Sequence, residues 1–137
     1  MEKEDIAMVA QDIILNFPKP VDKPVVLFLP KRRFSRYLDM MKMEKHVDKT
    51  PCFTAEMKGG NVIYFCQEVV NNFVKNFSRE MKKKFIEALT LHELLHIWNR
   101  LHVHTADEAV FSEKLVHKEM KNFYPSHFRV LEVVEHN

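Results

Sequence analysis

Apolar residues recur along this chain with two different periods, which predict helices at both ends and strands between them. Residues 4–17 carry apolar side chains at helical spacing, and Pro18 and Pro20 would end that helix. A continuous apolar run at 25–29 lies between prolines, which predicts a short buried strand. A second, weaker helix is expected at 31–43.

A hairpin is predicted at 52–66, where two strand-like segments flank a Lys-Gly-Gly loop. A loop of this length pairs Met57 with Asn61 and so sets the register. In that register the expected core face collects four apolar side chains: Phe53, Ala55, Ile63 and Phe65. Cys52 and Cys66 would then lie opposite each other on the other face, as two reduced thiols or, alternatively, as a cross-strand disulfide.

Helices are expected again in the second half of the chain. Residues 67–77 have a helical pattern, and a serine N-cap precedes the main helix at 79–101. A Thr-x-x-Glu capping box at 105–108 predicts the start of a last long helix, which should end at Tyr124 before a proline. Residues 126–137 are left as a tail or short helix.

Length and composition agree with one α+β domain covering residues 1–137, with a mixed sheet of about three strands packed on helices. Apolar residues make up 46% and charged residues 29% of the chain, as in ordinary globular proteins. The net charge of +2 is too small to indicate nucleic acid or an anionic membrane as partner. No apolar run reaches the roughly 18–20 residues of a membrane span, and no signal peptide is recognisable, so we expect a cytoplasmic protein.

The strongest chemical signal is the run His-Glu-Leu-Leu-His at His92–His96, in the middle of the main predicted helix. Histidines four residues apart leave the same face of a helix and can hold one zinc ion. Glu93 lies beside the first histidine, where it can take a proton from a zinc-bound water. Both histidines fall on the predicted buried stripe, where uncompensated polar groups are costly. The alternative is two satisfied core histidines with Glu93 in water.

This HExxH run resembles that of the zincin metallopeptidases. The order of predicted elements is also similar to theirs: a strand, a helix, two strands, the HExxH helix and a further helix. The resemblance implies a zinc-dependent hydrolase that cleaves peptide bonds, with one zinc ion on His92 and His96 and with Glu93 as general base. It also implies that the last strand before the HExxH helix, 62–65, lies at the cleft rim and pairs with an extended peptide or protein substrate.

A catalytic zinc usually has three protein ligands and a water, and Glu113 is the leading candidate for the third ligand. Glu113 and His117 lie at the centre of an apolar stripe on the last predicted helix, where a carboxylate needs a partner. That stripe consists of Ala106, Ala109, Val110, Val116, Met120 and Phe123. A helix hairpin turning near 102–105 would return Glu113 to the level of His92 and His96. The alternative for Glu113 is a salt bridge to Lys or Arg.

The placement of Glu113 resembles the minigluzincins, whose glutamate ligand lies on the next helix in an ExxxD motif. Here His117 stands where their aspartate supports the first histidine, so that supporting contact is in question. His102 is the alternative third ligand. The spacing His92-x3-His96-x5-His102 resembles that of the metzincins and of the zinc endoribonucleases of ribosomal-RNA maturation. Both groups carry Gly at the position of Asn99, because the helix must end there.

Weaker candidates lie nearby. The His-Thr-Ala-Asp run that ends at Asp107 is similar to the Gly-Thr-x-Asp pattern of the aspzincins, which makes Asp107 or Glu108 a further alternative ligand. The capping box explains the same residues more simply. His117, Tyr124 and His127 are candidate donors to a transition state.

Three functions are therefore open. The first is a zinc peptidase, and the second is a zinc endoribonuclease that uses His92, His96 and His102. Against the nuclease, Glu93 stands where those enzymes carry Gly, and the basic balance is slight. The third is a non-catalytic zincin-like binding domain. Residues 126–137 directly follow the expected ligand helix and are a candidate regulatory tail.

Overall fold

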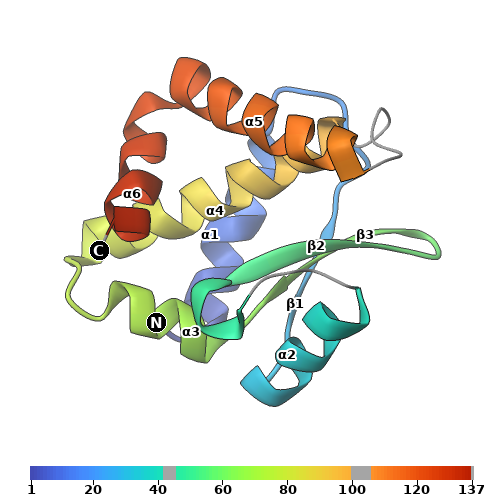
Figure 1. Ribbon diagram of the computed structural model, residues 1–137. Coiled ribbons are helices and arrows are strands. Elements are labelled where there is room, and N and C mark those ends of the chain that lie inside the picture. The colour runs from blue at the N-terminus through green and yellow to red at the C-terminus, as the bar shows by residue number, and fades with distance from the viewer. Residues whose placement is uncertain (42–45, 100–105, 137) are drawn as a thin grey trace.

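The computed structural model describes residues 1–41, 46–99 and 106–136, with side chains described for 1–41, 46–99 and 113–134. Within these segments the chain forms six α-helices, one short 3-10 helix and a three-stranded mixed sheet, which confirms the expected α+β class (Figure 1). The helices are α1 (Lys3–Asn16), α2 (Lys31–Met40), η1 (Val47–Lys49), α3 (Gln67–Val74), α4 (Arg79–Asn99), α5 (Ala106–Phe123) and α6 (Pro125–His136). The strands are β1 (Val25–Phe28), β2 (Cys52–Met57) and β3 (Gly60–Phe65).

The hairpin register differs from the predicted one by one residue. Met57 pairs with Gly60, and Cys52 pairs with Phe65, so the turn contains only Lys58 and Gly59. Gly59 and Gly60 have φ angles of 102° and 144°, which a residue without Cβ adopts at little cost. The two glycines therefore permit the tight connection between Met57 and Gly60.

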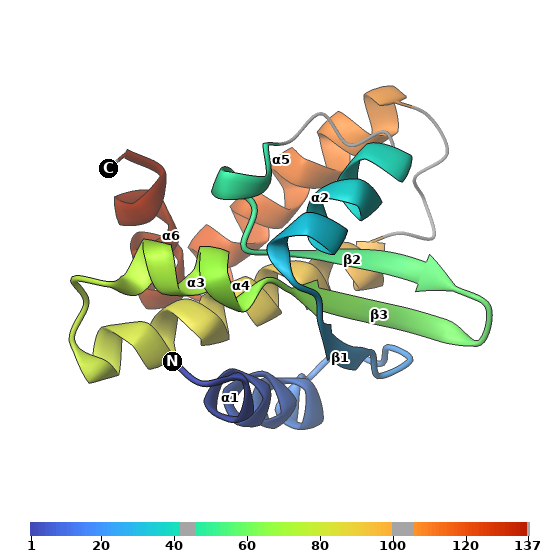
Figure 2. The ribbon, with the colours of Figure 1, turned by 90° about the horizontal axis from the view of Figure 1, so that it is seen from below.

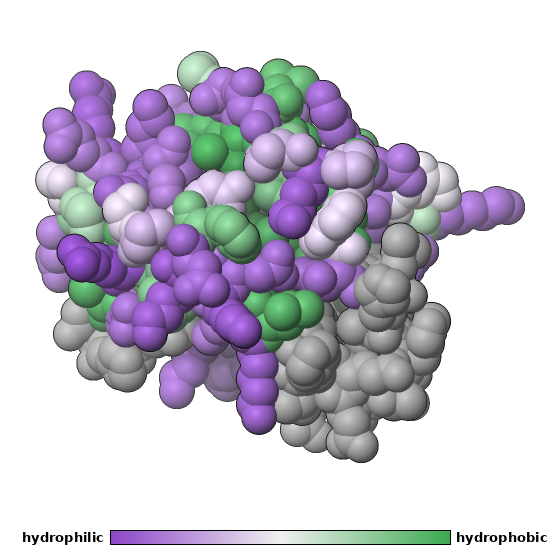
Figure 3. All heavy atoms as spheres, turned by 90° about the horizontal axis from the view of Figure 1, so that it is seen from above, coloured by the Kyte–Doolittle hydropathy of each residue, from purple (hydrophilic) through white to green (hydrophobic). Residues whose placement is uncertain are grey.

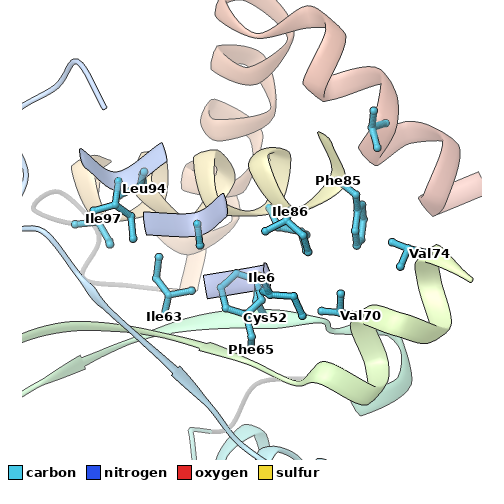
Figure 4. Packing of buried hydrophobic residues seen from close by; sticks show 14 residues of the cluster. Ile6, Cys52, Ile63, Phe65, Val70, Val74, Phe85, Ile86, Leu94 and Ile97 are labelled. Atoms are coloured by element: carbon cyan, nitrogen blue, oxygen red, sulfur yellow. The ribbon is translucent and has the colours of Figure 1, made fainter. Parts of the chain in front are cut away.

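The one-residue difference changes which β2 side chains share a face with those of β3, so the predicted core face is wrong. Phe53 and Ala55 face α2, together with a first group of buried residues: Phe34, Leu38, Tyr64 and Cys66. Cys52 faces α1 and α4 together with a second group: Ile6, Ala10, Ile14, Ile63, Phe65, Ile86, Leu94 and Ile97. Figure 4 shows Ile63 and Phe65 beneath the α4 side chains of this second group.

Helices cover both faces of the sheet, with α2 on one side and α1 and α4 on the other (Figures 1 and 2). The strand order is β1-β3-β2, with β3 parallel to β1 and antiparallel to β2. The expectation that 62–65 form the cleft rim is therefore wrong, because β3 is the central strand. The edge strand beside α4 is β2. The run 25–29 is not fully buried either, since β1 is the other edge and exposes Val25 and Leu27.

α5 and α6 pack on the side of α4 that faces away from the sheet (Figure 1). The apolar contacts between α4 and α5 are made by Ala88, Leu91, Leu95, Val116 and Met120. The predicted stripe on α5 ends at Met120, because Phe123 is exposed. The C-terminal residues, expected as a tail or a short helix, form the helix α6, whose Val130 is buried in the main core.

The face seen from above in Figure 3 is mostly hydrophilic, and its apolar residues form separate small patches. Phe123 and Val133 are among the exposed apolar residues of these two helices. Within the described segments, every helix is too short or too polar to cross a bilayer.

Because Cys52 and Cys66 lie on opposite faces of the sheet, we expect no disulfide between them. Protein unfolded in denaturant without reductant should take up two equivalents of iodoacetamide, measured by intact mass. In the folded protein Cys66 should react slowly, because it is buried and burial raises the pKa of its thiol. Unfolded protein that takes up no label would contradict the observed register.

Val130 and Val133 form a matched pair for testing whether α6 belongs to the core, since they are 4% and 46% exposed. Val130→Ala should lower the free energy of unfolding by about 1–3 kcal/mol, because it removes buried methyl groups. Val133→Ala should change it by no more than about 0.5 kcal/mol. Urea denaturation followed by circular dichroism measures both, and equal small effects would mean that α6 is a dispensable tail.

Candidate metal centre

The HExxH residues lie on α4, a helix that is buried on most of its circumference. One side of α4 packs on α1 and the sheet, and another side packs on α5. The side chains of His92, Glu93 and His96 are only 17%, 11% and 20% exposed. Three polar groups so far from water each need a partner.

Glu113 of α5 reaches both histidines from the opposite side of the site. Its Oε1 lies 2.8 Å from Nε2 of His96, and its Oε2 lies 3.5 Å from Nε2 of His92. The two imidazole rings meet edge to face, with centroids 4.7 Å apart. The structure thus brings together the three residues expected from the sequence, although their role as ligands stays a prediction.

The donor set fits zinc. His92, His96 and Glu113 offer ligand atoms that all lie within 4.8 Å of one another. Two imidazoles and one carboxylate are common ligands of catalytic zinc, which leaves a fourth position for water. Ligand atoms about 2.0–2.2 Å from a tetrahedral zinc lie roughly 3.3–3.6 Å apart. The three ligand atoms, one from each residue, lie within 4.8 Å of one another, so the side chains would have to draw closer together around an ion.

Glu113 is 42% exposed, more than an apolar helix stripe implies. It lines a pocket, which explains that exposure. Burial alone would raise the pKa of the Glu113 carboxyl. Interactions with the neighbouring His92 and His96 rings outweigh burial and hold that pKa far below its usual range. The carboxylate is therefore ionised, which is the form that binds a cation.

The alternative ligands fare differently. His102 lies outside the described residues, and the side chains of Asp107 and Glu108, at the start of α5, are not described either. α4 is helical up to Asn99, its last described residue. The Asn99 amide donates to a carboxylate oxygen of Glu119 on α5, at 2.7 Å. Asn99 is the last residue of α4 that the structure describes, so the helix end that the three-histidine families require after this position falls on residues outside the described segments.

Of the three candidate transition-state donors, only His117 lines the pocket. Its Nε2 lies 3.7 Å from Oε2 of Glu113, and its ring centroid lies 5.7 Å from that of His92. His127 instead contacts Glu87, with Nε2 and Oε1 3.3 Å apart. Tyr124 packs beside His127, with ring centroids 6.3 Å apart.

The pocket beside the three candidate ligands has a volume of about 690 Å³. One part is polar and contains His92, Glu93, Glu113 and His117. Residues 48–52, from η1 to the first residue of β2, also line the pocket. The remaining lining is apolar and comes from α3, α4 and α6: Phe73, Phe85, Leu89, Leu131 and Val134. Leu131 and Val134 come from α6, the segment that the sequence marked as a candidate regulatory tail.

Glu93 points towards β2. Thr54 Oγ1 donates to Oε2 of Glu93 at 2.5 Å, and Cys52 Sγ lies 3.8 Å from Oε1. Glu93 is therefore buried. The alternative interpretation of the sequence, with two core histidines, had expected Glu93 to be in water. The sequence prediction missed Thr54 and Cys52 because the assumed hairpin register put Phe53 and Ala55 on the core face instead.

Three comparisons with known proteins find nothing similar to this chain: no family model, no curated protein and no solved structure matches it. The assignment of a metal to these side chains rests on the donor set and its geometry.

Zinc affinity should depend on the three converging side chains. We expect Glu113→Ala to weaken zinc binding at least tenfold, about 1.4 kcal/mol, and His96→Ala to lose stoichiometric zinc. Glu132→Ala, which changes an exposed carboxylate on α6, is the matched control and should bind normally. Competition titration with a chromophoric chelator measures each affinity. If His102→Ala loses the metal and Glu113→Ala keeps it, the third ligand is His102.

Proposed function

We propose that this protein is a zinc-dependent hydrolase, a metallopeptidase of the zincin type that cleaves peptide bonds in a peptide or protein substrate. The observation that carries the proposal is the meeting of His92, His96 and Glu113 at a pocket. Its lining includes His92, Glu113 and the neighbouring Glu93. Metal ligands and a general base adjoining one pocket are what metal-assisted hydrolysis requires.

We assign each of these residues a role in hydrolysis. His92, His96 and Glu113 would hold one zinc ion. When bound, zinc supplies a water of near-neutral pKa and a positive charge that stabilises an oxyanion. Glu93 accepts the proton of the attacking water on its carboxylate and passes it to the leaving amine. The buried position of Glu93 limits competing solvent and fixes the base near the pocket.

A peptide suits the pocket better than RNA does. The apolar wall beside the site can take an apolar amino-acid side chain, whereas a nucleic acid would need cations for its phosphates. The described lining contains one lysine, Lys49, and the neighbouring Asp48 offsets its positive charge. The buried, pocket-facing Glu93 favours an enzyme over a non-catalytic binding domain.

Glu93→Gln separates these functions. It should keep the fold and zinc content but lower peptide hydrolysis by about 10²–10⁴-fold, because the amide cannot accept the proton. Glu80→Gln changes an exposed glutamate on the same helix and should retain full activity. Both are assayed with zinc against a fluorogenic peptide library and against structured RNA.

Each other outcome points to a different function. Peptide hydrolysis at the wild-type rate in Glu93→Gln excludes Glu93 as the base. Cleavage of RNA but not peptide supports the endoribonuclease. Stoichiometric zinc without cleavage of either substrate supports a non-catalytic binding domain.

A further inference from the structure

The Glu93 carboxylate is held by a side chain from a distant part of the sequence. Thr54, 39 residues earlier, donates its hydroxyl to Oε2 of Glu93 at 2.5 Å. This short distance is typical of a hydroxyl bonded to an ionised carboxylate. Because Glu93 is almost entirely buried, little water is available to replace that bond.

We propose that Thr54 is a positioning residue for the general base: its hydroxyl fixes Oε2 of Glu93 and leaves Oε1 to accept the proton of the attacking water. This inference rests on the proposed hydrolase function and adds to it a residue outside the HExxH motif. Thr54 acts through Glu93, and its own hydroxyl takes no part in the transfer.

The two oxygens of Glu93 have different surroundings. Oε2 accepts from the Thr54 hydroxyl, a strong donor at short distance. Oε1 has the Cys52 thiol at 3.8 Å and Nδ1 of His92 at 3.9 Å. A thiol is a weak donor, and a nitrogen at 3.9 Å is beyond hydrogen-bond distance. Oε1 is therefore the oxygen better placed to receive a proton.

The local backbone makes Thr54 a rigid support. Alternate side chains of a strand point to the same face, so Thr54 and Cys52 both face α4. Thr54 pairs with Ile63 of the central strand, whose side chain is fully buried. Threonine is branched at Cβ, which restricts its χ1 and holds the hydroxyl in place. A glutamate has three side-chain torsions, so a fixed anchor removes much of its freedom before substrate binds.

Thr54→Val keeps the shape of the side chain and removes the donor. In the zinc-loaded protein, we expect kcat for peptide hydrolysis to fall about tenfold or more, with KM and zinc affinity little changed. Thr54→Ser, which restores the hydroxyl, should recover most of the lost kcat. Thr90→Val is the matched control, because that buried threonine bonds the carbonyl of Ile86 in its own helix and should leave kcat unchanged.

A second readout needs neither metal nor activity. In metal-free protein, Thr54→Val should lower the melting temperature clearly when Glu93 is present and much less in a Glu93→Ala background. This non-additivity is expected because the valine leaves a buried carboxylate without its hydroxyl donor. Thr90→Val should lower the melting temperature equally in both backgrounds.

The outcomes separate the two proposals. If the wild type cleaves no peptide with zinc bound, the proposed function fails, and the positioning role fails with it. If the wild type is active and Thr54→Val has the same kcat, only the positioning role is overturned. Additive effects in the metal-free cycle would overturn it as well, because they would show that Thr54 and Glu93 do not interact.

Discussion

The organisation of this protein depends on one constraint: three adjacent polar side chains lie on a helix that is buried on most sides. His92, Glu93 and His96 cannot all reach water, so the surrounding elements must supply their partners. These partners come from two directions. Glu113 on α5 meets the histidines, and Thr54 on β2 meets the glutamate. The site therefore lies where the C-terminal helices and the edge of the sheet both adjoin α4.

The contact between Thr54 and Glu93 depends on the register of the β2–β3 hairpin. Because Met57 pairs with Gly60, Cys52 and Thr54 face α4, and Phe53 and Ala55 face α2. A slip of one residue would exchange these pairs and bring apolar side chains to the buried carboxylate. The positive φ angles at the two glycines thus contribute to the environment of the candidate base.

Local spacing in the sequence predicted the elements and most of the site. Four-residue spacing placed His92 and His96 on one helix face, and the apolar pattern of the following helix identified Glu113. Thr54 could not be found this way, because its role depends on register. Both faces of the sheet are apolar and covered, so alternation in β2 could not show which side chains meet α4. The strand order could not be predicted either, because the apolar pattern of a strand does not show which strand pairs with it.

The contacts of Glu113 suggest why a cation suits this site at neutral pH. The Glu113 carboxylate lies against Nε2 of both His92 and His96, and these contacts hold the pKa of the carboxyl far below its usual range. An imidazole nitrogen binds a metal only without its proton, so protons compete with a metal for any histidine ligand. The zinc ion that we propose would need these nitrogens in their neutral form and would bring positive charge next to the carboxylate. Protons and the proposed metal would therefore compete for one cluster. Acidification should therefore favour the metal-free cluster, whereas neutral pH should favour the state in which His92, His96 and Glu113 share an ion.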